Sequence, residues 1–405
     1  MIIERWEAEW LKKIRKWVMV YGRRKTGKTF LVRNFMDYDE YFFVKKDRTI
    51  FVGSTGKDIT YDTLKEVLTR MLKDGKTVVV DEFHRLGSDF LDYLHFTERK
   101  GRLVLISSTF HLARKILSEN SPILGLFAEF QVGLIRLDDV VRKLKKNMGK
   151  KELVELSILM REPLVIEYYR KGESPEDIVA SVISTSKYTV PALVGEVFNE
   201  EEKNLSAVYE GILRAVARGN QVSTEISSYL FSNRLIQKDD PSTIQPYLGN
   251  LIKFGLLKRV KIVNRNTYRY MHVSPLIQIF YYGDEKYNLS EIQGDNRFIS
   301  TIIAELFPRL VESHVREYFS RKYGLTEGIV EERDYEIDGY LMKFKKPEIA
   351  LEIKWAEKIS KDDVVTAMNN LFKVSAKRRI LFVPDKRKVK YKPDGIEIVD
   401  VLDIV

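Results

Sequence analysis

The segment Val18-Met-Val-Tyr-Gly-Arg-Arg-Lys-Thr-Gly-Lys-Thr-Phe-Leu31 decides the fold of this chain of 405 residues. An apolar run, typical of a buried strand, leads into Gly22-x-x-x-x-Gly27-Lys28-Thr29, and helical apolar spacing follows. In this strand–loop–helix context, the two glycines let successive backbone N–H groups turn toward phosphate oxygens. The start of the helix adds further donors and a partial positive charge, which favour an anion. We therefore predict a phosphate-binding loop for a nucleoside triphosphate.

This loop supplies most of the predicted nucleotide site. Lys28 can reach the β- and γ-phosphates, and the Thr29 hydroxyl can join the ligand shell of Mg²⁺. The residues that we expect to contact the nucleotide are Gly22, Arg23, Arg24, Lys25, Thr26, Gly27, Lys28, Thr29, Phe30 and, from a later strand, Ser108. The expected ligands are ATP and ADP, with Mg²⁺ as the accompanying ion.

A second segment, Lys76-Thr-Val-Val-Val-Asp-Glu-Phe-His84, indicates hydrolysis as well as binding. Its β-branched run is typical of a strand buried on both faces of a parallel sheet, and such sheets bind ligands at the carboxyl ends of their strands. Asp81 is predicted to hold Mg²⁺, mostly through water. Glu82 is predicted to orient and deprotonate the attacking water. His84 is expected to be a solvated residue of the following turn.

A third run, Arg102-Leu-Val-Leu-Ile-Ser-Ser-Thr109, ends in hydroxyl side chains. We expect Ser107, Ser108 or Thr109 to lie beside the γ-phosphate as a polar sensor, although small hydroxyl residues also end strands because they favour turns. Four expected strands alternate with three helical stretches: strands at 17–21, 40–44, 77–81 and 103–107, and helices near 28–36, 61–73 and 88–98. This alternation predicts an α/β fold with a parallel sheet and crossover helices.

Composition restricts the class of protein further. A hydrophobic content of 44% with 31% charged residues is typical of a globular protein, and no apolar run is long enough to cross a membrane. The opening Met1-Ile-Ile-Glu-Arg-Trp6 lacks the features of a signal peptide, so we expect a cytoplasmic protein without a membrane partner. The absence of cysteine excludes a disulfide framework, and five histidines make a zinc site unexpected. A net charge of +10 suggests a polyanionic partner, most simply DNA; a solvated basic surface is the alternative.

Helical spacing replaces the alternation after about residue 136. A helix start is marked at Ser174-Pro-Glu-Asp177 by a capping residue, a proline and acids in the first turn. We expect this part of the chain to form a helical lid packed on the ATPase core.

Residues from about 203 to 274 have the pattern of three helices followed by a hairpin, with Asn264-Arg265-Asn266 at its turn. This order describes a winged helix-turn-helix, whose third helix would enter a DNA major groove. Basic residues of the wing suit phosphate contacts: Lys258, Arg259, Lys261, Arg265 and Arg269. Since winged helices also pack against proteins, DNA contact and protein packing are both open for this region.

The last part of the chain carries a second group of chemically suited residues. Glu352 and Lys354 are two residues apart on an expected strand and therefore share one face, and Asp338 lies roughly opposite on the neighbouring strand. A carboxylate pair can bind Mg²⁺, with Mn²⁺ as an alternative, and the adjacent ammonium can stabilise developing charge. A helix over 310–324 precedes these strands, and a helix and a further strand follow. The order predicts an αβββαβ nuclease-like domain; alternating charges on an exposed strand are the bland alternative.

Most of the chain resembles the archaeal AAA+/STAND-type P-loop ATPase family with a winged helix and a C-terminal PD-(D/E)XK nuclease-like domain. The motifs that carry the resemblance are Tyr21-Gly-Arg-Arg-Lys-Thr-Gly-Lys-Thr29, Asp81-Glu-Phe83, Ser121-Pro122-Ile-Leu-Gly125, Tyr268-x-Tyr270 with Ser274-Pro-Leu-Ile-Gln-Ile-Phe-Tyr-Tyr282, and Ile337-Asp338 with Glu352-Ile-Lys-Trp355. The resemblance implies Mg-ATP hydrolysis by Lys28, Thr29, Asp81 and Glu82. It also implies a metal site at Asp338, Glu352 and Glu312. We expect four regions: a P-loop ATPase core (1–135), a helical lid (136–200), a winged helix (201–285) and the nuclease-like domain (286–405).

Two positions depart from the family pattern. An arginine usually follows soon after Ser-Pro-x-x-Gly, and Leu126 stands there in this chain. If that arginine stabilises the hydrolytic transition state, its role is lost or moved here, and turnover is slow. The lid element that resembles Gly-Gly-x-Pro is Met160-Arg-Glu-Pro163, so a second sensor arginine cannot be assigned.

Three functions remain open. The favoured one is a Mg-dependent ATPase that acts on DNA and carries a metal-dependent nuclease-type domain, with Lys28, Glu82, Asp338, Glu352 and Lys354 as catalytic residues. The second is a nucleotide-switched signalling or assembly ATPase whose C-terminal domain binds without cleaving. The third is an ATPase that acts as a chaperone or in transposon or plasmid maintenance. The intact Glu82 favours turnover over a mere switch, and the sequence is compatible with a homo-oligomer.

Overall fold

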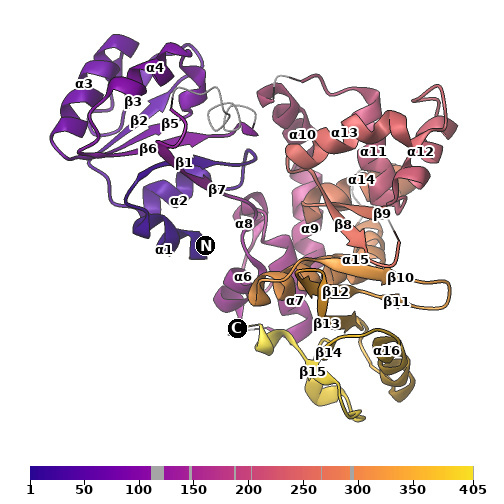
Figure 1. Ribbon diagram of the computed structural model, residues 1–405. Helices are drawn as coiled ribbons and strands as arrows, with labels where there is room; N and C mark the ends of the chain where they lie inside the picture. Colours follow the sequence, from indigo (N-terminus) through magenta and orange to yellow (C-terminus); the bar gives the residue numbers. More distant parts are fainter. Residues whose placement is uncertain are drawn as a thin grey trace. The chain divides into compact units, whose positions relative to one another are not determined.

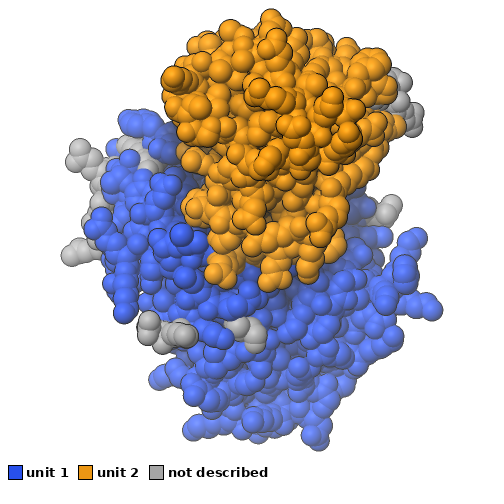
Figure 2. Space-filling view, turned by 90° about the vertical axis from the view of Figure 1, so that its left-hand side faces the viewer, with its two compact units in different colours: residues 1–3, 135–192, 205–405 blue, residues 4–134, 193–204 orange. Residues whose placement is uncertain are grey.

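The computed structural model describes residues 1–110, 123–145, 148–186, 188–201, 203–265, 267–291 and 296–404. The chain forms two compact units, coloured separately in Figure 2. The smaller unit contains residues 4–134 and 193–204, and the larger unit contains residues 1–3, 135–192 and 205–405.

The smaller unit is built on a seven-stranded sheet with the order β4-β3-β2-β5-β6-β1-β7 (Figure 1). Five neighbouring strands are parallel: β2 (Glu40–Val44), β5 (Thr77–Asp81), β6 (Arg102–Ser107), β1 (Trp17–Tyr21) and β7 (Phe127–Gln131). Two short antiparallel strands extend one edge: β3 (Ile50–Val52) and β4 (Asp58–Ile59). The described helices of this part are α1 (Trp6–Lys13), α2 (Lys28–Phe35), α3 (Tyr61–Lys73) and α4 (Asp89–Phe96). The parallel sheet with crossover helices, predicted from the sequence, is therefore confirmed.

The parallel strands are buried on both faces because successive side chains point into different apolar clusters. In β1, Trp17 and Met19 join one cluster, whereas Val18 and Val20 join the other. Helix α3 packs its apolar stripe of Leu64, Leu68 and Leu72 into the first cluster. The unbroken apolar runs of the sequence are thus explained by burial on two sides.

The larger unit begins with helices. They are α6 (Leu137–Leu144), α7 (Lys150–Leu159), α8 (Pro163–Tyr168) and α9 (Pro175–Ser186), and α10 (Thr189–Glu200) contributes residues to both units. The predicted helix start at Ser174 is present, because its hydroxyl accepts from the Asp177 N–H at 3.2 Å. Within the described part of the chain, no single helix is long and apolar enough to cross a membrane, and the bent pair α9 and α10 passes that test by length and composition alone.

Three further helices, a hairpin and a fourth helix follow in the predicted order. They are α11 (Ala207–Arg218), α12 (Ser223–Ser232), α13 (Pro241–Lys253), β8 (Leu257–Ile262), β9 (Thr267–His272) and α14 (Pro275–Tyr287). Helix α13 begins after Asp240, whose side chain accepts from the Ser242 N–H at 2.9 Å, and Pro241 stands in its first turn.

The remaining elements are a helix, four strand segments, a second helix and two strands, one more strand on each side of the second helix than the sequence predicts. They are α15 (Asn296–Tyr323), β10 (Gly328–Glu331), β11 (Glu336–Ile337), β12 (Gly339–Lys343), β13 (Lys346–Ile353), α16 (Lys361–Lys373), β14 (Arg378–Phe382) and β15 (Glu397–Val399). Strands β12 and β13 are antiparallel, and β13, β14 and β15 are parallel. Helix α15 starts well before the predicted residue 310, because buried apolar residues such as Ile302 and Leu306 continue its packed face upstream.

The hairpin β8–β9 is not a free wing, which the sequence did not show. Strand β10 pairs in parallel with β8, with Gly328 opposite Lys261, so the two hairpin strands belong to a four-stranded sheet of order β11-β10-β8-β9. The outer edge of β8 is therefore covered by the C-terminal part of the same unit.

Candidate functional site

The loop between β1 and α2 has the geometry that a phosphate cradle requires. Gly22 has a φ of 153°, and a Cβ atom there would lie 2.1 Å from the carbonyl oxygen of Val132. Gly27, with a φ of 85°, precedes the first residue of α2. The Lys28 ammonium donates to the carbonyls of Gly22 at 2.8 Å and Arg23 at 2.9 Å, inside the loop. The strand–loop–helix reading of the sequence is confirmed.

Asp81 lies at the carboxyl end of β5, where it joins the loop to the sheet. The Thr29 hydroxyl donates to its Oδ2 at 2.6 Å, and the Tyr41 hydroxyl donates to the same oxygen at 2.7 Å. Asp81 is fully buried. Burial, followed by the nearby Asp81 charge, raises the pKa of Tyr41 well above its usual value. Sequence reasoning paired Asp81 with Thr29 but missed Tyr41, which only the pairing of β2 with β5 brings alongside.

Glu82 follows in the left-handed conformation, with a φ of 57°. Its carboxylate lies 2.8 Å from Arg85 and 3.5 Å from the Nε2 of His84. The other ring nitrogen of His84 lies 3.4 Å from the Ser107 hydroxyl. Burial, with a smaller contribution from the Arg85 charge, lowers the pKa of His84 to about 4, so its ring is neutral at pH 7. The expectation that His84 is solvated is wrong, because the short turn after β5 points it back toward β6.

The end of β6 lies between the loop and Asp81, since β6 pairs with both β1 and β5. Ser107 contacts the Thr109 hydroxyl at 3.1 Å, whereas the buried Ser108 hydroxyl has no partner within the described residues. Ser108 instead lines a cavity of about 680 Å³ beside the loop. A small polar side chain at this point suits the predicted sensor role.

Some of the residues predicted to contact the nucleotide line this cavity, and others do not. Seven of them line it: Arg24, Lys25, Gly27, Lys28, Thr29, Phe30 and Ser108. Gly22 does not, and the side chains of Arg23 and Thr26 are buried instead, with the Thr26 hydroxyl donating to the Arg23 carbonyl at 2.8 Å. Five lining residues were missed by sequence reasoning: Arg33, Asn34, Tyr38, Phe43 and Arg85. Helical spacing from Phe30 to Arg33 and Asn34 is the signal that could have found two of them.

A second cluster of carboxylates lies in the larger unit. Gly339 pairs with Leu351, so Asp338 and Glu352 stand next along the two antiparallel strands. Asp338 accepts from the Ile353 N–H at 2.8 Å, and the Lys354 ammonium lies 3.5 Å from Glu352. Glu312, on α15, interacts electrostatically with the Asp338 carboxylate. The structure therefore brings Asp338, Glu352 and Lys354 together, and the Asp338 charge also acts on Glu312.

The electrostatics of this cluster are unfavourable for three negative charges. Burial and then the Asp338 charge raise the pKa of Glu312 and of Glu352 to about 8 in each case. Burial also raises the pKa of Asp338. Glu352 keeps one oxygen that is buried without a partner among the described residues. In that part of the chain, no three acidic or histidine side chains are already arranged around one metal position.

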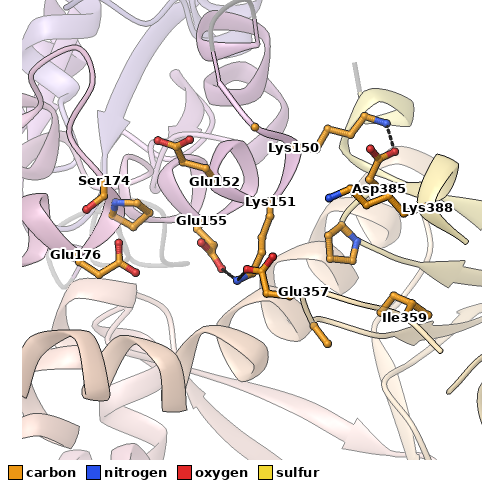
Figure 3. A pocket seen from close by; sticks show the side chains of 14 residues that line it. Lys150, Lys151, Glu152, Glu155, Ser174, Glu176, Glu357, Ile359, Asp385 and Lys388 are labelled. Atoms are coloured by element: carbon orange, nitrogen blue, oxygen red, sulfur yellow. Dashed lines mark hydrogen bonds and ion pairs between the residues drawn. The ribbon is translucent and has the colours of Figure 1, made fainter.

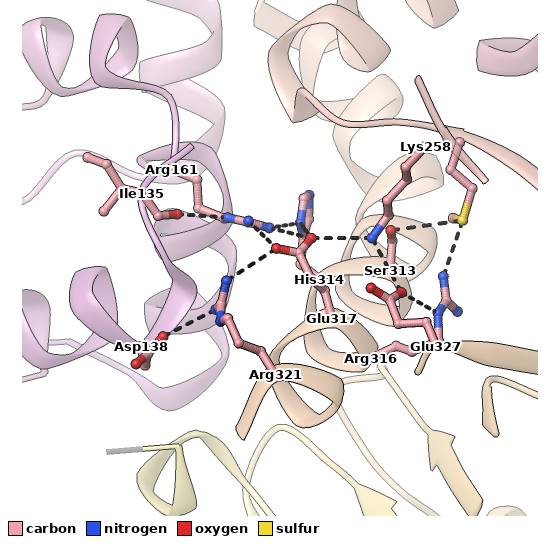
Figure 4. A network of polar contacts seen from close by, with 11 residues as sticks. Ile135, Asp138, Arg161, Lys258, Ser313, His314, Arg316, Glu317, Arg321 and Glu327 are labelled. Carbon is pink, nitrogen blue, oxygen red and sulfur yellow. Dashed lines mark hydrogen bonds and ion pairs between the residues drawn. The ribbon is translucent and has the colours of Figure 1, made fainter. Parts of the chain in front are cut away.

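Arg316 connects this cluster with a buried polar network (Figure 4). Its guanidinium donates to the Asp338 carbonyl at 2.6 Å and lies 3.3 Å from Glu327. Lys258 from β8 lies 3.5 Å from Glu327 and 3.2 Å from Glu317. The network therefore joins the strand of Asp338 to helix α15 and to the hairpin β8–β9.

The same network ends at Arg161, which lies just after α7. Its guanidinium lies 2.5 Å from Glu317 and donates to the Ile135 carbonyl at 2.9 Å (Figure 4). It also contacts His314, and its side chain is only 4% exposed. Arg161, in the lid motif where no sensor arginine could be assigned, is thus held inside the larger unit.

The wing cations named by the sequence are largely neutralised. Lys258 is paired as described, and both Arg265, at 3.5 Å, and Arg269 pair with Glu331. Arg259 is exposed and stacks over the Tyr268 ring. Three of the five wing cations are thus paired with carboxylates distant in sequence, whereas Arg259 and Lys261 are exposed, and contact between the wing and phosphates stays a prediction.

A cavity of about 430 Å³ lies between α7, the start of α9 and two loops of the C-terminal strands (Figure 3). Lys150 lies 2.7 Å from Asp385, and Lys151 lies 2.5 Å from Glu357. The indole of Trp355 donates to Glu155 at 2.9 Å. Since cations and carboxylates already pair with one another across this cavity, its lining favours neither an anionic nor a cationic ligand.

Comparison with solved structures shows a likeness of fold to a known ATPase. The solved structure of the Walker-type ATPase paby2304 of Pyrococcus abyssi matches with a TM-score of 0.51 and 18% identity, over 69% of this chain and 96% of that one. The chain has a Walker-type ATPase fold. The ORC2 protein of Aeropyrum pernix matches with a TM-score of 0.39 and 14% identity, over 74% of this chain and 94% of its own, a likeness too low to carry an argument.

Sequence comparison adds one relative and no family. No family model matches the chain. An uncharacterized protein of Methanocaldococcus jannaschii, MJECL04, is 26% identical over an alignment of 269 residues that covers 60% of this chain. The match spans only 57% of that relative's own length. The prediction of a P-loop ATPase core is confirmed at the level of the fold by the likeness to the Walker-type ATPase structure.

Proposed function

We propose that this chain is a Mg-dependent ATPase that acts on DNA and carries a metal-dependent nuclease-type C-terminal site. The observation that carries the ATPase half is the bond of 2.6 Å between Thr29 and Asp81 beside a glycine loop that holds Lys28. This pairing supports a Mg²⁺ role for both residues, because a hydroxyl and a carboxylate beside bound phosphates are ligands that Mg²⁺ takes. The fold likeness to a Walker-type ATPase supports the same reading.

Each residue has a defined task in hydrolysis. Lys28 would exchange its two loop carbonyls for phosphate oxygens, and Thr29 and Asp81 would hold Mg²⁺ beside the nucleotide. Glu82 orients and deprotonates the attacking water once it exchanges its contact with Arg85 for that water. Ser108 lies in the same cavity and can contact the γ-phosphate.

Two variants test this assignment in the full chain. Lys28→Ala should abolish ATP binding, because the ammonium that meets the phosphates is lost. Glu82→Gln should bind ATP as wild type does and lose phosphate release. Equal phosphate release by wild type and Glu82→Gln would refute the assignment of the base.

The C-terminal site supports the second half of the proposal. Asp338 and Glu352 are adjacent across antiparallel strands, Glu312 faces Asp338 from α15, and Lys354 lies beside Glu352. A divalent ion suits this donor set, because Glu352 has a buried oxygen without a partner among the described residues and three close carboxylates repel one another. When bound, such an ion would polarise a phosphodiester and activate a water molecule. Asp338, Glu352 and Glu312 would hold it, and Lys354 would stabilise developing negative charge.

A DNA-cleavage assay with Mg²⁺ or Mn²⁺ tests this half separately. Linear, branched and single-stranded DNA should be compared with and without ATP. We expect cleavage that disappears in Asp338→Ala/Glu352→Ala while ATP hydrolysis survives, since Glu82 and Lys28 belong to the other unit. Cleavage that persists in this double variant would rule out the site.

We also propose that α11 to α13 with the hairpin β8–β9 form a winged helix. The order of three helices and an antiparallel hairpin supports this assignment. The pairing of β8 with β10 favours its use as a packing module.

The second candidate function is a nucleotide-switched signalling or assembly ATPase whose C-terminal domain binds without cleaving. The absence of a ready-arranged metal position among the described residues favours it. This function would be identified if the protein binds DNA, does not cleave it with either Mg²⁺ or Mn²⁺ present, and turns over ATP slowly.

A further inference from the structure

An unusual turn joins β12 to β13. Strand β12 ends at Lys343 and β13 begins at Lys346, so only Phe344 and Lys345 form the turn. Both have positive φ, 49° and 65° respectively. Turns of this kind normally use Asn and Gly, because other residues are strained in the left-handed region. A phenylalanine and a lysine are thus placed where folding alone would favour other residues.

The exposure of this tip is equally unusual. Phe344 is 89% exposed, the highest value among the exposed large apolar side chains of the described residues. Lys343, Lys345 and Lys346 are also exposed, and none of them pairs with a carboxylate within the described part of the chain. The cations of the wing at Lys258, Arg265 and Arg269 do have such partners. The tip is therefore an available basic surface with an aromatic ring at its centre.

We propose that the tip of the β12–β13 hairpin, from Lys343 to Lys346, contacts nucleic acid. Phe344 stacks on or inserts beside a base, and the three lysines contact phosphates. An aromatic ring flanked by cations matches both parts of a nucleotide, the flat base and the charged backbone. This inference rests on the proposed action on DNA and names a contact surface for it.

The distance from the candidate metal site fits this role. Six residues of extended chain separate Asp338 from Phe344, which is roughly 20 Å at about 3.4 Å per residue. Duplex DNA carries one phosphate charge per about 1.7 Å of its axis, so a short bound segment spans both points. The hairpin can therefore position a nucleic acid whose backbone passes Asp338 and Glu352.

The test uses the full chain, duplex and single-stranded DNA of one sequence, and fluorescence anisotropy over a range of salt. Phe344→Asn should keep or raise the melting temperature, because Asn tolerates positive φ, and should weaken binding by roughly tenfold. Lys343→Ala/Lys345→Ala/Lys346→Ala should lower the slope of log affinity against log salt by about 2 to 3. The matched control, Lys12→Ala/Lys13→Ala/Lys16→Ala, removes three exposed lysines of the smaller unit and should leave the slope unchanged.

The outcomes separate this inference from the proposed function. If wild type binds DNA and both tip variants bind equally well, the inference is wrong and the proposed function stands. If wild type binds neither form of DNA, the proposed action on DNA fails first and the inference falls with it. Vesicles of anionic lipid provide the third arm: tip variants that lose vesicle binding but keep DNA binding would make the tip a membrane contact and overturn the inference.

Discussion

Asp81 and Glu352 are both buried carboxylates, yet their surroundings differ in kind. Asp81 receives two hydroxyl donors on one oxygen and the Glu82 N–H on the other. Glu352 shares its space with Asp338 and has an oxygen without a partner among the described residues. The first carboxylate is satisfied by the protein, whereas the second still lacks a positive partner on one side. This contrast suits a preorganised nucleotide site in one unit and a cation-dependent site in the other.

Tyr41→Phe tests the preorganisation of Asp81. The change removes a donor at 2.7 Å from a buried charge, and such bonds contribute about 1.5–3 kcal/mol. We expect a lower free energy of unfolding by denaturant and weaker binding of Mg-ATP, with binding of metal-free ATP unchanged. Tyr38→Phe is the control, because Tyr38 lines the same cavity without a described bond to Asp81. Equal loss of metal-free and Mg-bound ATP affinity would contradict a role through Asp81.

The raised pKa values of Glu312 and Glu352 predict a pH dependence of stability. Both pKa values are about 8 in the folded chain, above the ordinary value of 4.5, so the folded state holds protons that the unfolded state has lost. The contribution of these two groups to the free energy of unfolding is therefore fully present below pH 4.5 and is lost as pH rises through 8. Without divalent ions, the melting temperature of wild type should fall more between pH 6 and pH 8 than that of Glu312→Gln. Added Mn²⁺ should raise the melting temperature more at pH 8 than at pH 6, and equal effects would argue against ion binding there.

At the scale of elements, helix α15 organises the larger unit through its polar face. Glu317 meets Arg161 on one side and Lys258 on the other, and Arg316 reaches the Asp338 carbonyl. Removing one partner of a buried pair leaves an uncompensated charge and costs roughly 3–5 kcal/mol. Arg161→Met should therefore lower the free energy of unfolding by several kcal/mol while ATP binding, whose residues lie in the other unit, is kept. Arg378→Met, at an ion pair with Glu397 whose side chains are 42% and 50% exposed, should change little. A similar loss in both variants would refute the importance of the buried network.

The elements also show what sequence could predict and what it could not. Strands such as β5 were predictable because Val78, Val79 and Val80 are buried on both faces, which leaves an unbroken apolar run. The alignment of Asp338 with Glu352 followed from strand periodicity and a short turn. Pairing across long separations could not be predicted: Lys258 and Glu327 are 69 residues apart, and nothing local marks β8 for pairing with β10. The carboxylate partners of three wing cations, Lys258, Arg265 and Arg269, were therefore not foreseen.

At the scale of the whole molecule, the nucleotide site and the carboxylate cluster belong to different compact units. Chains with several units need not unfold in one step. A ligand that binds only the folded form stabilises the unit that holds its site, by an amount that grows with the logarithm of its concentration. Calorimetry should therefore show two transitions, of which Mg-ATP raises one and Mn²⁺ without nucleotide raises the other.

Site variants assign these two transitions. Lys28→Ala should remove the shift caused by ATP and keep the shift caused by Mn²⁺, because its ammonium serves only the loop of the smaller unit. Asp338→Ala/Glu352→Ala should do the reverse, since these carboxylates lie in the larger unit. A single cooperative transition that both ligands raise together would show that the two units unfold as one. In that case nucleotide binding would stabilise the fold that holds the carboxylate cluster, and the two sites would be thermodynamically linked.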